Sequence, residues 1–250
     1  MQESLTQTSN LSHLVDIVRP NLEWRVLMIA GDEWRIAFDL APHVNYVTLV
    51  CPTAEQAREV DETAAKLHLK NINCGFHDPE YLPYADHNFD LLVCHHMAHR
   101  LHDVKEWLPR VTRILQPQGL IALTTYLVPG TRLRGKKARK LGEAGDYLKA
   151  FFQLHDTKHQ KYYSQNGWED LLIRSGFDIR SVETADKQLD FAQWVDEFSL
   201  TSKDQLRLKA MLIQAPEKAR EFLTTQFSGD RIRFRLPEFT ILATSKANTD

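Results

Sequence analysis

The sequence has little of several features that mark particular classes of protein. Its 250 residues include only three cysteines, an odd count without CxxC spacing: Cys51, Cys74 and Cys94. This count favours reduced thiols and argues against a zinc site. No apolar run approaches the roughly 20 residues that a membrane-spanning helix needs. The first 13 residues also lack the basic and apolar regions of a secretion signal. We therefore expect a cytoplasmic protein without a membrane span.

Charge of one sign is not in excess. The 31 basic and 33 acidic residues give a net charge of −2, so no overall field attracts nucleic acid or membrane. The stretch 132–140 is basic and could dock an anionic substrate, a carrier protein or nucleic acid. It has no aromatic residues between its charges, so we expect a solvated loop and no nucleic-acid site.

Short buried strands alternate with helices in the first half of the chain. Apolar runs bounded by turn or polar residues predict strands at 25–30, 46–50, 71–76, 89–94 and 120–128. Apolar spacing predicts helices over 53–69, capped by Thr53, and over 103–115. Continuous apolar runs are typical of strands buried on both faces of a parallel sheet. We expect an α/β protein with a doubly wound, mostly parallel sheet of the Rossmann-like kind.

The second half is more helical and less regular. Residues 129–146 are polar and basic, and they predict a flexible connection to a helix from about Tyr147. A helix, a Ser-Gly stop and a strand are expected over 166–184, a long amphipathic helical region over 190–226, and a final strand over 234–247. We predict one domain over residues 1–250, with a core at about 22–128 and 166–250. Residues 129–165 and 190–226 would form its helical cover.

Glycine is scarce where a nucleotide-binding fold usually needs it. In "VLMIAGDEWRIA", the turn after the first predicted strand, the only glycine is Gly31. In a doubly wound sheet this turn lies at the carboxyl ends of the strands, where ligands bind.

The segment 82–129, "LPYADHNFDLLVCHHMAHRLHDVKEWLPRVTRILQPQGLIALTTYLVP", resembles class I S-adenosylmethionine-dependent methyltransferases. The nearest branch includes the ubiquinone and menaquinone biosynthesis methyltransferases. The segment 156–179 resembles the D-x-x-H and "W--LL--AGF" region of that branch, and "RVLMIAGDEWRIA" stands in place of its glycine-rich loop. The resemblance implies a seven-stranded sheet with the last strand inserted antiparallel, and S-adenosylmethionine as cofactor.

The same resemblance assigns cofactor-binding positions at the carboxyl ends of the first four strands. They are Ala30, Gly31, Asp32, Cys51, Asp78, Pro79 and His95. Asp78 matches the aspartate beside the adenine amine, whereas Cys51 stands where an acidic residue would accept hydrogen bonds from the ribose. Loss of that carboxylate should cost about 1.5–3 kcal/mol of binding. Asp32 and Glu33 would also face the carboxylate of the cofactor, and Trp34 adds bulk.

Histidines supply the candidate chemistry. His96 and His99 are candidate general bases, because histidine titrates near neutral pH and both follow the fourth strand. His95 and His99 could also face one another on a helix as metal ligands, but no third ligand has suitable spacing, and we expect no metal. His159 and Tyr162 are candidate substrate contacts near the opening of the pocket.

Two functions remain open from the sequence. In the first, the chain is a methyltransferase acting on a small, apolar or ring-bearing molecule. In the second, it is a pseudo-methyltransferase that does not bind S-adenosylmethionine. It would then act as a subunit for a protein partner or a second copy of itself, or use its pocket for another ligand or reaction.

Overall fold

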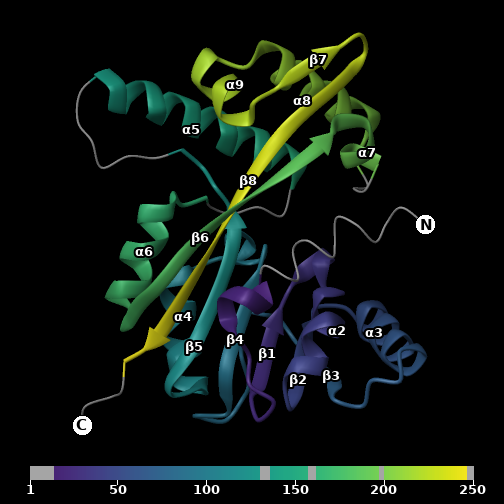
Figure 1. Cartoon of the computed structure of the whole chain (residues 1–250), viewed down its shortest axis with the longest axis vertical. Coiled ribbons are helices and arrows are strands. Elements are labelled where there is room, and N and C mark those ends of the chain that lie inside the picture. The colour runs from purple at the N-terminus through teal and green to yellow at the C-terminus, as the bar shows by residue number, and fades with distance from the viewer. Residues whose placement is uncertain (1–13, 130–135, 157–161, 197–199, 247–250) are drawn as a thin grey trace. The chain divides into compact units, whose positions relative to one another are not determined.

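Figure 1 shows a computed structural model of the chain, which describes residues 14–129, 136–156, 162–196 and 200–246. These residues divide into two compact units. Unit 1 holds residues up to Thr125 together with Glu169–Glu183 and the segment from Thr240 onward. Unit 2 holds Tyr126–Trp168 and Thr184–Phe239. The prediction of one domain with a helical cover stays a prediction.

One sheet organises the fold, and the apolar runs of the sequence form its centre. Its strands are β1 (Arg25–Ile29), β2 (Tyr46–Cys51), β3 (Ile72–Phe76), β4 (Phe89–His95), β5 (Leu115–Tyr126), β6 (Phe177–Asp190), β7 (Gln226–Ser228) and β8 (Arg231–Ser245). Seven of them follow the order β3-β2-β1-β4-β5-β8-β6, and β7 pairs with β8 beside this path. The pairs β1–β2, β1–β4, β2–β3 and β4–β5 are parallel. The predicted α/β class is confirmed.

The last strand lies inside the sheet, between β5 and β6, as the resemblance implied. In Figure 1 the yellow arrow of β8 points opposite to the arrow of β5. The strand order reverses direction between β1 and β4, because β2 and β3 lie on one side of β1 while β4 and β5 lie on the other. Ligands of doubly wound sheets bind at such a reversal, beyond the carboxyl ends of the strands.

Helices connect the strands of unit 1. They are η1 (Gly31–Glu33), α2 (Ile36–Leu40), η2 (Ala41–His43), α3 (Ala54–Lys66), η3 (Ala98–Arg100), α4 (Val104–Ile114) and α6 (Gln165–Arg174), whose first turn belongs to unit 2. Thr53 caps α3 as predicted, because its Oγ1 accepts a hydrogen bond from the Gln56 amide at 3.1 Å. Gly176, at φ +87°, takes the left-handed conformation that glycine allows after a helix and separates α6 from β6. The predicted Ser-Gly stop is therefore confirmed.

The remaining helices are α5 (Lys136–His155), α7 (Phe191–Asp196), α8 (Ser202–Gln214) and α9 (Glu217–Leu223). Aromatic rings fill a buried cluster in unit 2, where Phe151 stacks on Trp194 with ring centroids 5.7 Å apart and Phe234 packs edge-on against both. In the part of the chain that the structure describes, no helix is long and apolar enough to cross a membrane.

Three boundaries differ from those predicted. The strand expected from residue 120 begins at Leu115, and α5 begins at Lys136 although residues 129–146 were expected to be a flexible connection. The helical region predicted over 190–226 contains separate helices α7, α8 and α9. Pro216 explains one break, because its fixed φ suits the residue before α9 and it has no amide hydrogen to continue α8.

Candidate functional site

The turn after β1 keeps one glycine for a steric reason. Gly31 lies at φ +47°, and a Cβ placed on it would lie 2.5 Å from the Met97 sulfur. Its carbonyl accepts a hydrogen bond from Gln56 Nε2 at 2.8 Å, which ties the turn to α3. Ala30, beside it, is buried. The backbone of this turn therefore keeps a left-handed conformation that glycine adopts without strain.

Trp34, which was expected to add bulk at this turn, packs into the core of unit 1. Its side chain is buried in the core of unit 1 and packs edge-on against Phe38, with ring centroids 5.6 Å apart. The large residue at a position usually occupied by glycine thus serves the core, where aromatic burial stabilises the fold. Asp32 lies in η1, and its side chain is outside what the structure describes.

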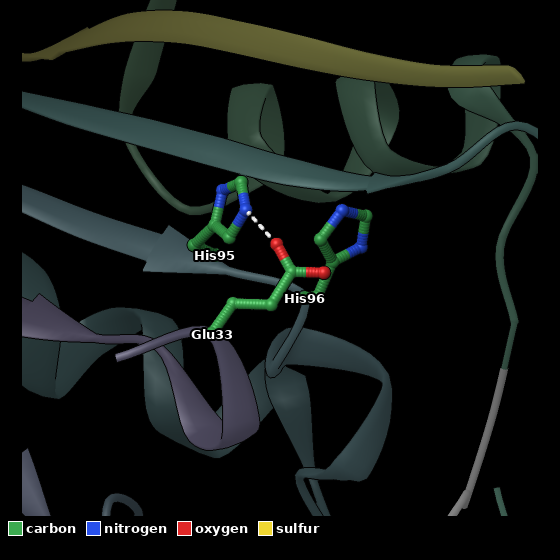
Figure 2. A group of neighbouring side chains, drawn as sticks. All are labelled: Glu33, His95 and His96. Atoms are coloured by element: carbon green, nitrogen blue, oxygen red, sulfur yellow. Dashed lines mark hydrogen bonds and ion pairs between the residues drawn. The ribbon is translucent and has the colours of Figure 1, made fainter. Parts of the chain in front are cut away.

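Glu33, at the end of the same turn, meets the histidines that follow β4. A carboxylate oxygen of Glu33 lies 2.8 Å from His95 Nε2, and Figure 2 shows this carboxylate between the rings of His95 and His96. Both histidines are buried, while the Glu33 side chain is 39% exposed. The carboxyl ends of β1 and β4 therefore bring together one acidic and two imidazole groups, each offering a ligand atom within 4.8 Å of the others.

A backbone feature explains how two consecutive histidines reach the same place. Successive side chains of a strand point to opposite faces. His96 lies at φ +47°, a conformation that few residues other than glycine adopt, and this ends the alternation directly after His95. The His96 amide still donates to the Thr124 carbonyl at 2.9 Å, so the turn is anchored to β5. Unusual backbone conformations of this kind gather at functional sites.

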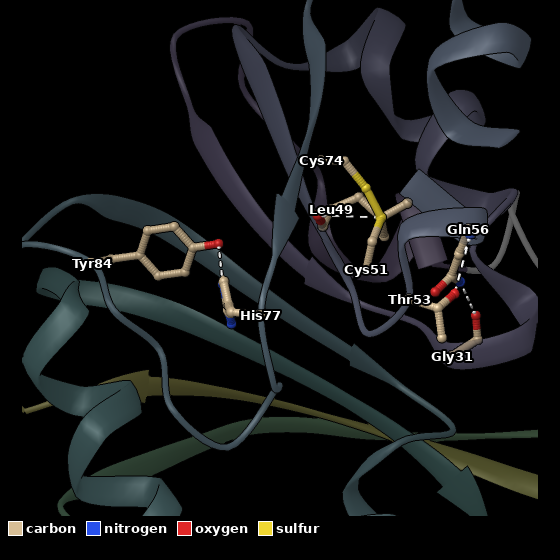
Figure 3. The surroundings of a disulfide bond; sticks show 8 residues. All are labelled: Gly31, Leu49, Cys51, Thr53, Gln56, Cys74, His77 and Tyr84. Carbon is tan, nitrogen blue, oxygen red and sulfur yellow. Dashed lines mark hydrogen bonds between the residues drawn. A yellow bond between two sulfur atoms is a disulfide. The ribbon is translucent and has the colours of Figure 1, made fainter. Parts of the chain in front are cut away.

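Two of the three cysteines form a disulfide, so the prediction of reduced thiols is wrong for Cys51 and Cys74 (Figure 3). The register of β2 and β3 pairs Leu49 with Cys74 and Cys51 with Phe76. This places the two cysteines diagonally on neighbouring strands, with Cα atoms 6.0 Å apart, within the usual span of a disulfide. Cys51, held in this disulfide, offers no carboxylate to accept hydrogen bonds from a ribose.

Cys94 is the cysteine that fits the prediction. It is a free thiol, fully buried in β4. Burial raises the pKa of this thiol to about 12, although backbone hydrogen bonds near Met97 and Ala98 lower it in part. A thiol in this environment behaves as a small hydrophobic side chain.

The turn after β3 presents Asp78 to solvent. Its carboxylate accepts a hydrogen bond from the Glu80 amide at 2.8 Å and keeps further acceptor capacity. The carbonyl of Pro79 accepts a hydrogen bond from the Trp107 indole at 3.0 Å, which fixes the turn to α4. Beside it, His77 Nε2 lies 2.7 Å from the hydroxyl of Tyr84, whose pKa burial raises to about 12 (Figure 3). Asp78 is thus an exposed acceptor on a rigid turn.

The remaining predicted site residues are either buried or outside the part of the chain that the structure describes. His99 is buried in η3. Tyr162 is buried in the aromatic cluster of unit 2, 5.0 Å from the ring of Phe152. His159 lies outside the described residues. The roles of His96 and His99 as bases, and of His159 and Tyr162 as substrate contacts, stay predictions.

Sequence reasoning missed Glu33 as a partner of His95, and it missed the disulfide. Glu33 is 62 positions from His95, so no local spacing joins them. The predicted strand topology could have indicated this contact, because the neighbouring parallel strands β1 and β4 end beside one another. The same reasoning applies to Cys51 and Cys74, which lie near the ends of consecutive predicted strands.

The chain matches a family model over part of its length and individual proteins over more of it. Residues 31–123 match the family model described as a methyltransferase domain. The chain is 29% identical over 161 residues to the uncharacterized protein YafE of Escherichia coli K12, covering 64% of this chain and 73% of YafE. It is 21% identical over 242 residues to the uncharacterized methyltransferase YcgJ of Bacillus subtilis 168, covering 96% of this chain and 92% of YcgJ.

Solved structures agree on the fold. The crystal structure of YcgJ superposes with a TM-score of 0.84 at 20% identity, covering 96% of this chain and all of the YcgJ chain. An S-adenosylmethionine-dependent methyltransferase from Mesorhizobium loti gives a TM-score of 0.56 at 17% identity, covering 97% of this chain and 99% of that one. The sheet and its strand order are those of the class I methyltransferase fold.

The residues at the strand ends fit S-adenosylmethionine at two positions and lack an acceptor at a third. Gly31 keeps the left-handed backbone, and Asp78 offers an exposed carboxylate suited to an adenine amine. Cys51, at the position where the resemblance puts the ribose acceptor, lies in a disulfide. The absent charged hydrogen bond is worth about 1.5–3 kcal/mol, which corresponds to a loss of roughly 10- to 150-fold in affinity.

Proposed function

We propose that this chain, which carries a methyltransferase domain over residues 31–123 and has the class I methyltransferase fold, transfers a methyl group from S-adenosylmethionine to a small molecule. The observation that supports this most is the conjunction of the family match with a retained Gly31 turn and an exposed Asp78 at the carboxyl ends of β1 and β3. We propose an acceptor that is small and apolar or ring-bearing, and a cytoplasmic location for the protein.

The chain's own residues have distinct parts in this proposal. The backbone of Ala30 and Gly31 would hold the methionyl portion of the cofactor, Asp78 and Pro79 would hold its adenine, and His95 would line the same site. When bound, S-adenosylmethionine supplies an activated methyl group. Most of the rate then comes from aligning donor and acceptor, with His96 or His99 able to accept the proton that the acceptor atom loses.

A second candidate function is favoured by two specific contacts. Cys51 is held by Cys74, and the Glu33 carboxylate is held by His95 where the cofactor head group would bind. Both contacts oppose cofactor binding. In this alternative the chain is a pseudo-methyltransferase that serves as a partner subunit or uses its pocket for another ligand or reaction.

Calorimetry on the full chain distinguishes the two functions. The oxidised and the reduced protein are each titrated with S-adenosylhomocysteine, and the protein as purified is analysed by mass spectrometry for that nucleoside. Saturable binding that Asp78→Asn weakens supports the methyltransferase. Absence of binding in both redox states, with no nucleoside in the purified protein, overturns it and supports the pseudo-methyltransferase. The variant Asp61→Asn is the matched control, since Asp61 is an exposed aspartate on α3.

A further inference from the structure

The group formed by Glu33, His95 and His96 has the composition of a metal site. One carboxylate and two imidazoles form the ligand set of several catalytic zinc centres and of other sites for divalent transition metals. With both imidazoles neutral, the set carries one negative charge and favours a divalent cation. Each residue offers one ligand atom, and these atoms all lie within 4.8 Å of one another.

The three ligand atoms lie within 4.8 Å of one another, so small side-chain movements would bring them to coordination distances. Ligand atoms about 2.0–2.1 Å from a tetrahedral zinc ion lie roughly 3.4 Å from one another. The Glu33–His95 separation of 2.8 Å is shorter than this and must open slightly. Glu33 can make this adjustment, because its side chain is 39% exposed and it ends a helix of only three residues. The two histidines are already held, His95 at the end of β4 and His96 through its bond to Thr124.

Burial disfavours the alternative in which Glu33 orients His95 as a general base. In such a pair, the nitrogen of His95 that does not contact Glu33 must reach the substrate. That atom, Nδ1, is buried and has no hydrogen-bond partner among the described residues. The nitrogen that faces Glu33, and through it the solvent, is Nε2. This geometry suits binding of an ion from the Glu33 side.

We infer that Glu33, His95 and His96 bind a divalent transition metal ion, with Zn²⁺ as the ion to test. Three protein ligands leave a coordination position for water or for an oxygen or nitrogen atom of a small molecule. The inference goes beyond the proposed function and does not depend on it, because it involves only these side chains and the ion; with His96 as a ligand, His99 would be the remaining candidate base. A bound cation would also neutralise Glu33, whose charge otherwise opposes a carboxylate-bearing cofactor.

The test is calorimetric titration of the full chain with ZnCl₂, after removal of metal with EDTA and without reductant, so that the Cys51–Cys74 bond remains intact. We expect saturable binding of one ion. Glu33→Gln and His96→Asn should each weaken it by more than about 100-fold, since even groups that only orient metal ligands contribute 10- to 100-fold. His102→Ala is the control, because His102 is exposed on the segment after η3 and should leave binding unchanged.

Two further measurements test whether a loss of metal binding reflects these ligands, rather than unfolding of the variant or binding by other side chains. Thermal unfolding without metal shows whether each variant is folded, and Glu33→Gln is the principal variant because Glu33 is half-exposed. The visible absorption of the Co²⁺-loaded protein should show nitrogen and oxygen ligands without thiolate bands. Wild-type protein that binds no Zn²⁺, or binding that Glu33→Gln and His96→Asn leave unchanged, overturns the inference. Neither result depends on whether S-adenosylmethionine binds.

Discussion

Gly31 is the residue whose conformation and packing most restrict substitution in the β1 turn. Alanine at this position would adopt φ +47° and place its Cβ 2.5 Å from the Met97 sulfur. The left-handed conformation alone costs about 1–2 kcal/mol for a residue with a Cβ. We expect Gly31→Ala to lower the free energy of unfolding by about 1–3 kcal/mol, measured by urea denaturation.

The control for this prediction is Gly142→Ala. Gly142 lies inside α5, and a Cβ there would meet no atom within 4 Å. Alanine in a helix interior should raise stability by about 0.5–1 kcal/mol. Equal effects of the two substitutions would show that the Gly31 turn is not held in the left-handed conformation.

Cys94 should make stability depend on pH above neutrality. Burial raises its pKa to about 12 in the folded protein, whereas an exposed thiol has a pKa of about 8.5. Above pH 8.5 the unfolded chain therefore loses a proton that the folded chain keeps, and the free energy of unfolding falls with pH by up to about 1.4 kcal/mol per unit. This contribution is complete below pH 8.5 and is lost as pH rises toward 12.

The measurement is the difference in unfolding free energy between pH 8 and pH 10, for the wild type and for Cys94→Ala. The wild type should lose about 1–2 kcal/mol more than the variant. Partly buried Tyr84, whose pKa is also raised, contributes equally to both proteins and cancels. The same pH dependence in both would mean that the Cys94 thiol is exposed.

At the scale of single residues, the sequence indicated the site region but not its contacts. Gly31, Asp78 and His95 were placed at strand ends by pattern and resemblance. The pairings Glu33–His95 and Cys51–Cys74 depend on which strands are neighbours. Such contacts between distant residues leave no periodic trace in the sequence.

Among the elements, α3 shows how a local signal predicts a helix boundary. Thr53 is its N-cap, and Gln56 links the same first turn to the carbonyl of Gly31. Removing the cap should lower the free energy of unfolding by about 1 kcal/mol. We expect Thr53→Ala to lower the melting temperature by about 2–4 °C, the usual equivalent of 1 kcal/mol for a chain of this size.

Thr53→Ser is the matched variant, because it keeps the accepting hydroxyl oxygen and should unfold within about 1 °C of the wild type, as serine caps helices at least as well as threonine. Differential scanning calorimetry provides the comparison. A loss as large in Thr53→Ser as in Thr53→Ala would indicate that the methyl group, rather than the cap, stabilises this turn.

Elements without a local boundary signal were predicted less accurately. The start of β5 at Leu115 and the start of α5 at Lys136 were both placed too late. Residues 116–119 contain a proline and a glycine, and residues 129–146 are polar and basic, so local preference opposes the structure that forms. In β5 the partner strand decides, because Leu115 pairs with Phe89 of β4. Tertiary pairing can override such preferences.

For the whole molecule, the fold was predictable because its central strands are buried on both faces. Val26, Leu49 and Leu91, from three neighbouring strands, are fully buried, so their segments appear as continuous apolar runs. The predicted helical cover over 129–165 and 190–226 falls within unit 2. Strands β6 and β8 each continue from one unit into the other, so no linker-like composition marks the boundary in those segments.

The stability of the entire chain also reports on cofactor binding. A ligand at 100 times its dissociation constant stabilises a protein by about 2.7 kcal/mol. For a chain of this length that should raise the melting temperature by about 5–11 °C. Under the proposed function, S-adenosylhomocysteine should produce this shift in the wild type.

Asp78→Asn should halve that shift. The asparagine keeps an oxygen for the Glu80 amide, so the turn should remain folded, but its hydrogen bond to the adenine amine loses the charge. A tenfold weaker affinity at the same ligand concentration leaves about 1.4 kcal/mol of stabilisation. Asp61→Asn, on the exposed side of α3, should keep the full shift. Equal shifts in the two variants would place the adenine away from β3, whereas no shift even in the wild type would favour the pseudo-methyltransferase.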